Sequence, residues 1–301
     1  MNILVAGGTG MLGSPLVKSL AQRGHTVSIL SRNPDAHRSN FPATIQLHAW
    51  KPEDNKWKVY LADKDVVINL AGAHLASRLW TKKRKRVLRE SRLHTTHALT
   101  SALLAQPRPP GRFVQASAVG YYGNRGEEVL ADNAQPGDDF LAHLCAAWED
   151  ASAPLSDTGM TRIILRTGIV LAAHDGALPR LMLPFRLFAG GKLGDGSQWM
   201  PWIHHHDVIR AIVHLVEHPA SRGAYNLTAP SPVLNRDFAE TLGKVMRRPS
   251  WLPVPASILR FVLGEMSAVL LHSQRAVPDR LLAEEFTFHH PHLRAALEDL
   301  L

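Results

Sequence analysis

The chain has 301 residues, of which 45% are hydrophobic and 20% charged, so it can bury a large core and is not an intrinsically disordered protein. Its only cysteine, Cys145, excludes an intrachain disulfide and suits a reducing compartment, so we expect a cytoplasmic location. The formal net charge of +8 is compatible with anionic ligands, and the apolar residues 1–5 leave no room for a secretory signal peptide.

The first half of the chain alternates short apolar runs with helical patterns, which is typical of βαβ units around a parallel sheet. The basic run 82–86 opens one of these helices without a base-reading module, so we interpret it as a solvated helix face and expect no nucleic-acid partner. We predict an α/β fold with a doubly wound parallel sheet. The predicted strands are 2–6, 26–30, 44–48, 65–69, 112–116 and 162–166, and the predicted helices are 11–23, 55–62, 80–105 and 139–157.

After residue 170, prolines and the glycine-rich segment 189–196 break the chain, which predicts a smaller, mostly helical region that covers the substrate. We expect Asp207 to be the N-cap of a helix that runs to about His218. Residues 252–271 are apolar, but prolines and charged residues interrupt them, so we expect no membrane-spanning helix. Further helices are predicted at 235–247, 256–272 and 291–301.

The first predicted strand runs directly into a glycine-rich turn and an amphipathic helix. In this turn Gly7 permits a tight exit from the strand, Gly10 lets the backbone approach a pyrophosphate, and Gly13 allows close helix–sheet packing. The N–H groups of Met11 and Leu12 then point at the phosphates from a helix N-terminus. The glycines could instead serve only the turn, but the βα frame favours a dinucleotide bound to Gly7, Thr9, Gly10, Met11 and Leu12.

We therefore predict a Rossmann-type dinucleotide-binding domain over 1–170, which also uses parts of 200–230, and a substrate-covering region over 171–301. The end of the second strand carries Ser31 and Arg32 instead of an acidic residue. A hydroxyl and a guanidinium suit a 2′-phosphate, so we predict NADP(H) rather than NAD(H). Asp35 is the one acid near enough to contest this choice.

Two other segments are expected to contact the same cofactor. The fourth strand ends in small residues, Leu70, Ala71 and Gly72, which let a ribose lie against the strand end. Trp50, just past the third strand, could flank the adenine, or it could be a surface-anchoring aromatic.

Short motifs continue along the whole chain. They are Asn69-Leu70-Ala71-Gly72, Trp80-Thr81, Ser91-Arg92, Ser117 to Gly123, Phe140-Leu141-Ala142, Trp148-Glu149, Arg166 to Leu171, Leu183 to Arg186, Trp202-Ile203-His204 with Asp207, and a closing segment from about 248 to 301. With these motifs the chain resembles the extended short-chain dehydrogenase/reductases. Among them it is similar to the atypical nucleoside-diphosphate-sugar epimerase-like family with a C-terminal domain of unknown function. The resemblance implies that Leu70 and Ala71 touch the cofactor, that Arg92 reaches back toward it, and that Val170 lies near the nicotinamide.

Enzymes of this superfamily use a Ser or Thr after the fifth strand with a Tyr-x-x-x-Lys pair on the next helix. The resemblance keeps the serine as Ser117. Anchored on Glu149, it puts Leu141 at the tyrosine position and Cys145 at the lysine position, and no other Tyr-x-x-x-Lys occurs. The usual proton relay is therefore missing, and the family's epimerase activity does not carry over.

Substitute proton donors follow the fifth strand. We take Ser117 and Tyr121 as candidate catalytic residues, because they lie at the carboxyl end of the sheet, where α/β folds bind ligands. Tyr121 and Tyr122 could instead be aromatic packing under the loop. Cys145 could be a thiol in the cleft, although a small core residue is the favoured interpretation.

Three consecutive histidines, His204 to His206, precede Asp207. Adjacent side chains point in different directions, so we expect no metal there and place His204 in or near the substrate cleft. Arg186, Trp199 and Trp202 are further cleft candidates, and an arginine there suits an anionic substrate.

The sequence supports two functions. The first is an NADPH-dependent oxidoreductase that acts on a carbonyl or hydroxyl of a small, possibly anionic metabolite through an unconventional proton donor. The second is an NADPH-binding sensor or scaffold protein without turnover. The substrate, the reaction direction and the oligomeric state are not indicated by any motif.

Overall fold

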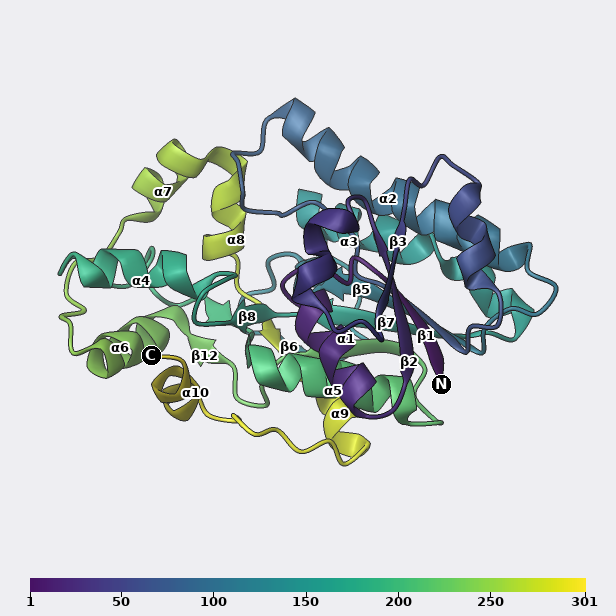
Figure 1. Ribbon diagram of the computed structural model, residues 1–301. Helices are drawn as coiled ribbons and strands as arrows, with labels where there is room; N and C mark the ends of the chain where they lie inside the picture. The colour runs from purple at the N-terminus through teal and green to yellow at the C-terminus, as the bar shows by residue number, and fades with distance from the viewer.

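A seven-stranded parallel sheet forms the centre of the protein, which the computed structural model describes over residues 1–301 (Figure 1). The strand order is β11-β7-β5-β4-β1-β2-β3, so the direction of winding reverses between β1 and β4. This confirms the predicted Rossmann-type doubly wound fold, and such folds bind ligands where the order reverses. The strands are β1 (Asn2–Ala6), β2 (Thr26–Ser31), β3 (Gln46–Ala49), β4 (Val66–Asn69), β5 (Arg112–Ala118), β7 (Thr161–Thr167) and β11 (Gly223–Leu227).

Helices bury both faces of this sheet. In β1, Ile3 and Val5 belong to the core shared with α1 (Gly13–Gln22) and α5 (His205–Glu217). Leu4 and Ala6 belong to the opposite core, shared with α2 (Lys82–Leu104), and α3 (Phe140–Asp150) lies beside α2. Side chains alternate between the two faces of a strand, so a strand covered on both sides is a continuous apolar run.

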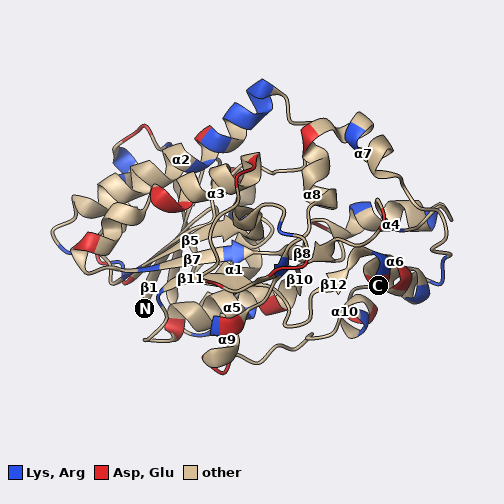
Figure 2. Ribbon diagram, turned by 180° about the vertical axis from the view of Figure 1, so that it is seen from behind, with Lys and Arg blue, Asp and Glu red and all other residues tan.

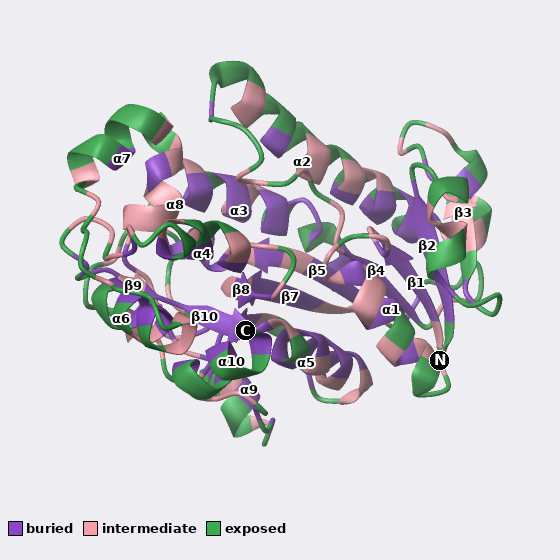
Figure 3. Ribbon diagram, turned by 60° about the vertical axis from the view of Figure 1, so that its left-hand side comes forward, coloured by how far each residue is buried: buried purple, intermediate pink, exposed green.

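A third core lies in the region after residue 170 (Figure 3), where Trp202 is fully buried with side chains of α4, α6 and α10. The helices of this region are α4 (Leu178–Arg186), α6 (Asn235–Met246), α7 (Ala256–Leu263), α8 (Ala268–Leu271), α9 (Asp279–Ala283) and α10 (Leu293–Leu300). Its short strand pairs are β8 (Ile169–Leu171) with β10 (Trp202–His204), β9 (Trp199–Met200) with β12 (Val233–Leu234), and β6 (Val129–Leu130) with β13 (Arg275–Ala276). The 3-10 turns of the chain are η1 (Asp35–Asn40), η2 (Lys56–Leu61), η3 (Val119–Tyr122), η4 (Ala153–Thr158) and η5 (Gly264–Ser267).

The longest helix, α2, has 23 residues and begins with the basic run 82–86 (Figure 2). Lys82, Lys83 and Arg86 are exposed, so most of the run is the solvated face that was predicted. Lys85 differs, because its ammonium group pairs with Glu265. No helix of the protein, α2 included, has the length and the apolarity needed to cross a bilayer.

Some predicted elements are shorter than expected. The helix predicted for 139–157 ends at Asp150, and the chain continues as η4, with Pro154 in its first turn. The helix predicted for 256–272 breaks at Gly264, whose φ of +54° is a left-handed value that glycine adopts without strain. The segment 55–62 contains only the 3-10 turn η2, and the strand predicted for 44–48 lies at 46–49.

The cap of α5 is a second difference. Asp207 is not the N-cap, which is His204, whose Nδ1 accepts the His206 N–H at 3.2 Å. Asp207 is fully buried in the first turn, where its carboxylate accepts the backbone N–H groups of His289 and His290 at 2.9 and 2.8 Å. The prediction was wrong because a tertiary contact with a distant segment uses the carboxylate that a local pattern assigns to the cap.

Candidate cofactor and substrate site

The glycine turn packs directly on the exit of β4. Gly7 has a φ of +79°, and a Cβ on it would lie 2.9 Å from the Leu70 carbonyl carbon and the Ala71 nitrogen. A Cβ on Gly13 would lie 2.3 Å from the Gly7 carbonyl oxygen, so Gly13 permits the close approach of α1. The fold itself therefore requires both glycines, and it brings Gly7, Leu70 and Ala71 together where the strand order reverses.

Gly10 is different, because little in the protein occupies the space above it. A Cβ there would meet only the Gly7 carbonyl oxygen, at 3.4 Å. The backbone N–H groups of Met11 and Leu12 donate to no protein acceptor, and no side chain caps α1. Thr9 is half-buried in the same turn. Open space and free N–H groups at a helix N-terminus fit a pyrophosphate.

The end of β2 offers a free cation. Arg32 is exposed and has no hydrogen bond or ion pair within the protein, whereas Ser31 is buried and accepts the Asn33 N–H at 3.3 Å. Asp35 is exposed in the first turn of η1. A guanidinium without an internal partner fits a phosphate group at the adenosine end of the site.

Trp50 is not placed as either of its two predicted roles requires. Its side chain is 3% exposed and packs edge-on against Trp57, with the ring centroids 5.9 Å apart. Both tryptophans belong to the core under the sheet face that α2 covers. We therefore correct the prediction: Trp50 is a core residue. The sequence placed it just past the end of a strand, but its ring packs into the apolar core on that face of the sheet.

Asn69 and Arg92 hold the segment after β4. The Asn69 side chain donates to Thr96 Oγ1 at 3.0 Å and accepts the Ala71 N–H at 3.1 Å.

Arg92, on α2, donates to the carbonyl oxygens of Leu88 and Ala73 at 3.0 and 3.1 Å, and burial lowers the pKa of its guanidinium. Its guanidinium lies against Gly72, at the exit of β4.

Ser117 lies in a buried polar network. Its Oγ donates to Glu149 Oε1 at 2.6 Å, and Arg166 binds the same carboxylate through Nε and Nη2 at 3.0 and 2.8 Å. Arg166 Nη1 also donates to the Tyr122 hydroxyl at 3.1 Å. Each charge in the network has an opposite charge beside it, which is the condition for burying an ion pair.

Tyr121 and Tyr122 differ in their surroundings. Burial raises the pKa of Tyr122 to about 12, and its hydroxyl donates to Asn226 Oδ1 at 2.7 Å. The Tyr121 ring stacks on the Arg166 guanidinium, 3.5 Å from its centroid, and its hydroxyl has no hydrogen bond within the protein. Tyr122 is therefore a structural residue, while the Tyr121 hydroxyl stays uncommitted.

The positions that correspond to the Tyr-x-x-x-Lys pair lie on the inner side of α3. A Cβ on Gly120 would lie 3.3 Å from Leu141 Cβ and 3.8 Å from Cys145 Sγ. Burial raises the pKa of the Cys145 thiol to about 12, and the Glu149 carboxylate adds to the shift. Cys145 is therefore a core residue, and neither it nor Leu141 supplies a mobile proton.

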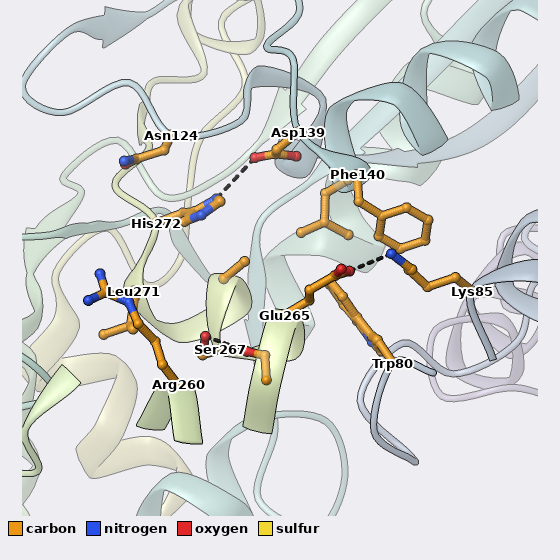
Figure 4. Close-up of a pocket in the computed structure, with 13 residues that line it drawn as sticks. Trp80, Lys85, Asn124, Asp139, Phe140, Arg260, Glu265, Ser267, Leu271 and His272 are labelled. Carbon is orange, nitrogen blue, oxygen red and sulfur yellow. Dashed lines mark hydrogen bonds and ion pairs between the residues drawn. The ribbon is translucent and has the colours of Figure 1, made fainter. Parts of the chain in front are cut away.

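A cleft of about 620 Å³ opens beside Leu141, between α3, the start of α2 and the segment from α7 to α8 (Figure 4). Arg260 lines it, is exposed, and has no acidic partner. Lys85 lines it too, but its ammonium group pairs with Glu265. The other lining residues are Trp80, Asn124, Asp139, Phe140, Gly264, Ser267, Ala268, Leu271 and His272.

An acid–base pair lies in this cleft. The Nδ1 atom of His272 is 3.0 Å from Asp139 Oδ2 (Figure 4). Asp139 is the N-cap of α3, two residues before Leu141, so the pair lies close to the position where the superfamily places its tyrosine. The two atoms are in contact but are not aligned as a hydrogen bond. A rotation of the imidazole that lets Nδ1 donate to the carboxylate would fix the tautomer and leave Nε2 for proton transfer.

Residues 3–228 match the model of the NAD dependent epimerase/dehydratase family. The chain belongs to this family. It is 38% identical over 302 residues to the epimerase family protein YfhF of Bacillus subtilis, covering 100% of this chain and 98% of the relative. It is 32% identical to human epimerase family protein SDR39U1 (isoform 2), solved with NADPH, with a TM-score of 0.87 and coverage of 100% and 99%. A chloroplastic SDR39U1 homologue of Arabidopsis thaliana is 34% identical, covering 100% of this chain and 87% of the relative.

A second family model, the domain of unknown function DUF1731, matches residues 254–300. In this epimerase family protein that domain supplies one wall of the cleft, including Arg260, Glu265 and His272. The opposite wall comes from the epimerase/dehydratase part, through Asp139 and Leu141. The cleft thus lies between the two family regions.

The sequence prediction missed most of this cleft. Asp139 and His272 lie more than a hundred residues apart, and no spacing pattern links them. Neither Ser117 nor Tyr121 lines the cleft. One feature of the sequence could have indicated the cleft: Phe140 and Leu141, which line it, belong to a motif of the family that the chain resembles, and Asp139 directly precedes them.

Four cleft residues expected from the sequence lie elsewhere. His204 is 1% exposed and Trp202 is fully buried. Trp199 donates through Nε1 to Glu127 Oε2 at 2.7 Å, and Arg186 is exposed near the end of α4. None of these four residues lines this cleft.

Val170 lies near the glycine turn. Gly176 lies between the two, because a Cβ on it would be 3.2 Å from both the Met11 sulfur and the Val170 carbonyl oxygen. Val170 itself is 7% exposed in β8. The chain after β7 therefore borders the phosphate end of the candidate cofactor site.

Proposed function

We propose that this epimerase family protein is an NADPH-dependent oxidoreductase that acts on a carbonyl or hydroxyl of a small anionic metabolite in the cleft beside Leu141. The observation that carries the proposal is the Asp139–His272 pair, a proton donor and its orienting carboxylate in the cleft that borders the missing tyrosine. The NADPH bound to human SDR39U1 supports the choice of cofactor. We further propose a reducing compartment such as the cytoplasm, because the one thiol is buried.

The cofactor-binding residues follow from the free groups at the strand ends. The N–H groups of Met11 and Leu12 hold the pyrophosphate above Gly10. Arg32 binds the 2′-phosphate beside Ser31. In addition, Gly7, Thr9, Leu70, Ala71, Gly72, Arg92 and Val170 line the dinucleotide. In our proposal these contacts make 1–170, with β11, the dinucleotide-binding domain and 171–301 the substrate-covering region.

NADPH supplies a hydride, so the protein has to supply the proton and hold the substrate. His272 donates the proton from Nε2, while Asp139 stabilises the imidazolium that donates it. Arg260 binds the anionic group of the substrate, because it is the exposed cation of the cleft without an acidic partner. Phe140 and Trp80, whose rings pack edge to face, exclude water from one side.

Ser117 and Tyr121, the donors predicted from the sequence, have lesser parts in this proposal. Ser117 is a positioning residue, since its hydroxyl proton is committed to Glu149. Tyr121 is the second candidate donor, because its hydroxyl has no partner within the protein. If Tyr121→Phe loses turnover while His272→Asn keeps it, Tyr121 is the proton donor and His272 is not.

Leu141 and Cys145 favour a second candidate function, an NADPH-binding sensor or scaffold without turnover. Both positions that carry the superfamily's proton relay are apolar and buried here. This function uses the same cofactor groups, Gly10 and Arg32, and makes no demand on the Asp139–His272 pair.

The deciding experiment follows NADPH oxidation at 340 nm against a panel of aldehydes, ketones and keto acids. We expect turnover that favours anionic carbonyls and that falls about 10²- to 10⁴-fold in His272→Asn. His143→Asn, an exposed histidine of the same helix as Asp139, is the matched control and keeps the wild-type rate. Arg260→Ala raises KM for the anionic compounds only. NADPH binding without turnover on any panel member would establish the sensor or scaffold instead.

A further inference from the structure

Three groups of side chains bring histidines and carboxylates together outside the cleft. They are His204 with His290 and Asp299, His206 with Asp207 and His289, and His214 with His218 and Glu284. In each group the nitrogen and oxygen atoms lie within 4.8 Å of one another. The expectation that three consecutive imidazoles do not converge is consistent with this arrangement, since His204 and His206 face different partners.

In the first two groups, hydrogen bonds within the protein already use the atoms that a metal ion would need. His204 Nδ1 accepts the His206 N–H as the cap of α5, so in the neutral ring the hydrogen is on Nε2, the atom that faces Asp299 at 3.3 Å. A nitrogen that carries a hydrogen cannot bind a metal ion. In the second group the Asp207 carboxylate accepts two backbone N–H groups and the Arg210 guanidinium. Little of its acceptor capacity remains for a cation.

In the third group the competing contact is to a side-chain hydroxyl, because His218 Nδ1 lies 3.2 Å from Ser221 Oγ. A hydroxyl can rotate and the imidazole hydrogen can move to Nε2, so this contact does not fix the tautomer as the backbone N–H of His206 does. His214 and His218 lie one turn apart on α5, and their rings are stacked with centroids 5.2 Å apart. The His214 Nε2 atom is shielded from solvent and has no hydrogen-bond partner. It lies 3.7 Å from Glu284 Oε2, and His218 Nδ1 lies 3.5 Å from the same oxygen. These distances are too long for good hydrogen bonds.

The same distances suit ligands of one metal ion. Zinc binds imidazole nitrogen and carboxylate oxygen at about 2.0–2.1 Å with tetrahedral angles, which places ligand atoms about 3.3–3.4 Å apart. The observed separations of 3.5 and 3.7 Å are close to this value. The two rings are stacked within 13° of parallel, so side-chain rotations that aim both nitrogens at one point are needed to complete the set, without a change in the backbone.

Neighbouring groups hold the Glu284 carboxylate in place. Ser221 Oγ donates to Oε2 at 2.7 Å and Tyr225 Oη donates to Oε1 at 2.5 Å. Hydrogen bonds to a ligand carboxylate orient it and strengthen metal binding. Arg280, which donates to the Tyr225 hydroxyl, is the one cation next to this pair.

We propose that His214, His218 and Glu284 form a Zn²⁺ site with a water molecule as the fourth ligand. The site joins α5, on the Rossmann sheet, to the end of α9 in the DUF1731 segment, and the two helices lie side by side in Figures 1 and 3. Glu217, which stands between the two histidines in sequence, forms two hydrogen bonds to Arg23 at 2.6 and 2.7 Å. It therefore does not act as a base at the metal, and the site fastens two parts of the fold.

The test is a titration of the full chain, first stripped with a chelator, with zinc sulfate at pH 7.5. Calorimetry is expected to show one tight equivalent of Zn²⁺, and thermal unfolding is expected to shift to higher temperature as Zn²⁺ is added, because the ion binds the folded state. Mg²⁺ at the same concentration produces no shift, because it prefers an all-oxygen shell.

Variants locate the bound ion. We expect His214→Ala to weaken Zn²⁺ binding at least about 10- to 100-fold, and Glu284→Gln to weaken it in the same range while keeping an acceptor for Tyr225. His218→Gln provides a third variant at a half-exposed position, in case either of the others fails to fold. The matched control is the double variant His206→Ala/His289→Ala, which removes another histidine pair and leaves the tight equivalent intact.

Two results overturn the proposal. One is a wild-type chain without a tight equivalent of Zn²⁺. The other is Zn²⁺ binding that survives within twofold in folded His214→Ala and His218→Gln, or that disappears in the His206→Ala/His289→Ala control.

Discussion

The two oxygens of the Asp139 carboxylate serve Ala142 and His272 separately. Oδ1 accepts the Ala142 N–H at 2.9 Å and caps α3, while Oδ2 lies 3.0 Å from His272 Nδ1 in the cleft. Burial disfavours the carboxylate, but the His272 side chain and the backbone N–H outweigh it, so the pKa of Asp139 is lowered. The carboxylate is therefore ionised at neutral pH and can face a protonated imidazole.

Asp139→Asn separates these two tasks. Asparagine caps a helix about as well as aspartate, so the free energy of unfolding should change by less than about 1 kcal/mol, whereas Asp139→Ala should cost about 1 kcal/mol more. Turnover should fall about 10²-fold or more in both variants, because the charge beside His272 is lost. Urea unfolding and NADPH oxidation measure the two effects. An asparagine variant with wild-type turnover contradicts the role given to the pair.

Arg32 should decide between the two dinucleotides. Arg32→Ala removes a charge-assisted contact to the 2′-phosphate, so NADPH affinity should fall about 10- to 100-fold while NADH affinity changes little. Fluorescence titration of both nucleotides measures this. Arg108→Ala is the control, since Arg108 is exposed in the loop before β5, where the parallel strands begin, whereas Arg32 lies where they end. Equal losses for NADPH and NADH would refute the prediction.

Gly10 and Gly13 should fail in different ways. In Gly10→Ala the new Cβ has an ordinary 3.4 Å contact, so we expect near wild-type stability and a large loss of NADPH binding. In Gly13→Ala the Cβ would lie 2.3 Å from the Gly7 carbonyl oxygen, and overpacking of this kind costs about 1–3 kcal/mol or more. Thermal unfolding without nucleotide and NADPH titration together distinguish the two. A Gly10→Ala protein that binds NADPH normally would show that the phosphates lie elsewhere.

Arg166 should be a main determinant of stability. Arg166→Met leaves Glu149 buried and without its counter-charge, which costs about 3–5 kcal/mol. Adding Glu149→Gln should restore part of the loss, because a buried neutral amide needs no counter-charge. Urea unfolding of the three proteins gives the values. A loss below about 1 kcal/mol in Arg166→Met would mean that water reaches Glu149.

Stability should fall in acid through His204. Burial lowers its pKa from 6.5 to about 4, and His290 and His205 add to the shift, outweighing the carboxylates of Asp299 and Asp207. The folded state thus favours the neutral ring, so its stabilising effect is complete above pH 6.5 and is lost as the pH falls toward about 4. Between pH 7 and pH 4.5 we expect a loss of about 1–3 kcal/mol from this group.

His204→Asn tests this pH dependence. Asparagine keeps a capping oxygen for α5 but does not titrate, so the variant should lose less stability than the wild type over the same interval. Urea unfolding at pH 7 and at pH 4.5 measures the difference. Identical pH dependence in the two proteins would assign the acid sensitivity to other groups.

Six of the seven strands of the sheet were predicted, because their signals are local, whereas β11 (Gly223–Leu227), which pairs with β7, was missed. Most of the predicted strands are short apolar runs. The glycine turn after β1 is required sterically at Gly7 and Gly13, and the glycine spacing in the sequence already indicates this. The position of Arg32 directly after β2 was predictable for the same reason, while its role toward the cofactor stays a prediction.

The cleft could not be predicted, because its residues meet only through tertiary structure. Asp139 and His272 come from different family regions, and Asp207 was assigned to a cap although two distant backbone N–H groups bind it. Trp50 was misplaced because local sequence does not say how deep the core extends past β3. In each case a long-range contact overrides a local preference.

The position of β11 at the edge of the sheet has a consequence for synthesis of the protein. β7 ends at Thr167 and pairs with β5 on one side, but the strand that covers its other side begins only at Gly223, after the whole of α4 and α5. While the chain emerges from the ribosome, the edge of β7 waits with unpaired backbone groups that other chains can join. A nascent chain that has not yet reached Gly223 therefore exposes an open strand edge, a feature that favours pairing with other chains.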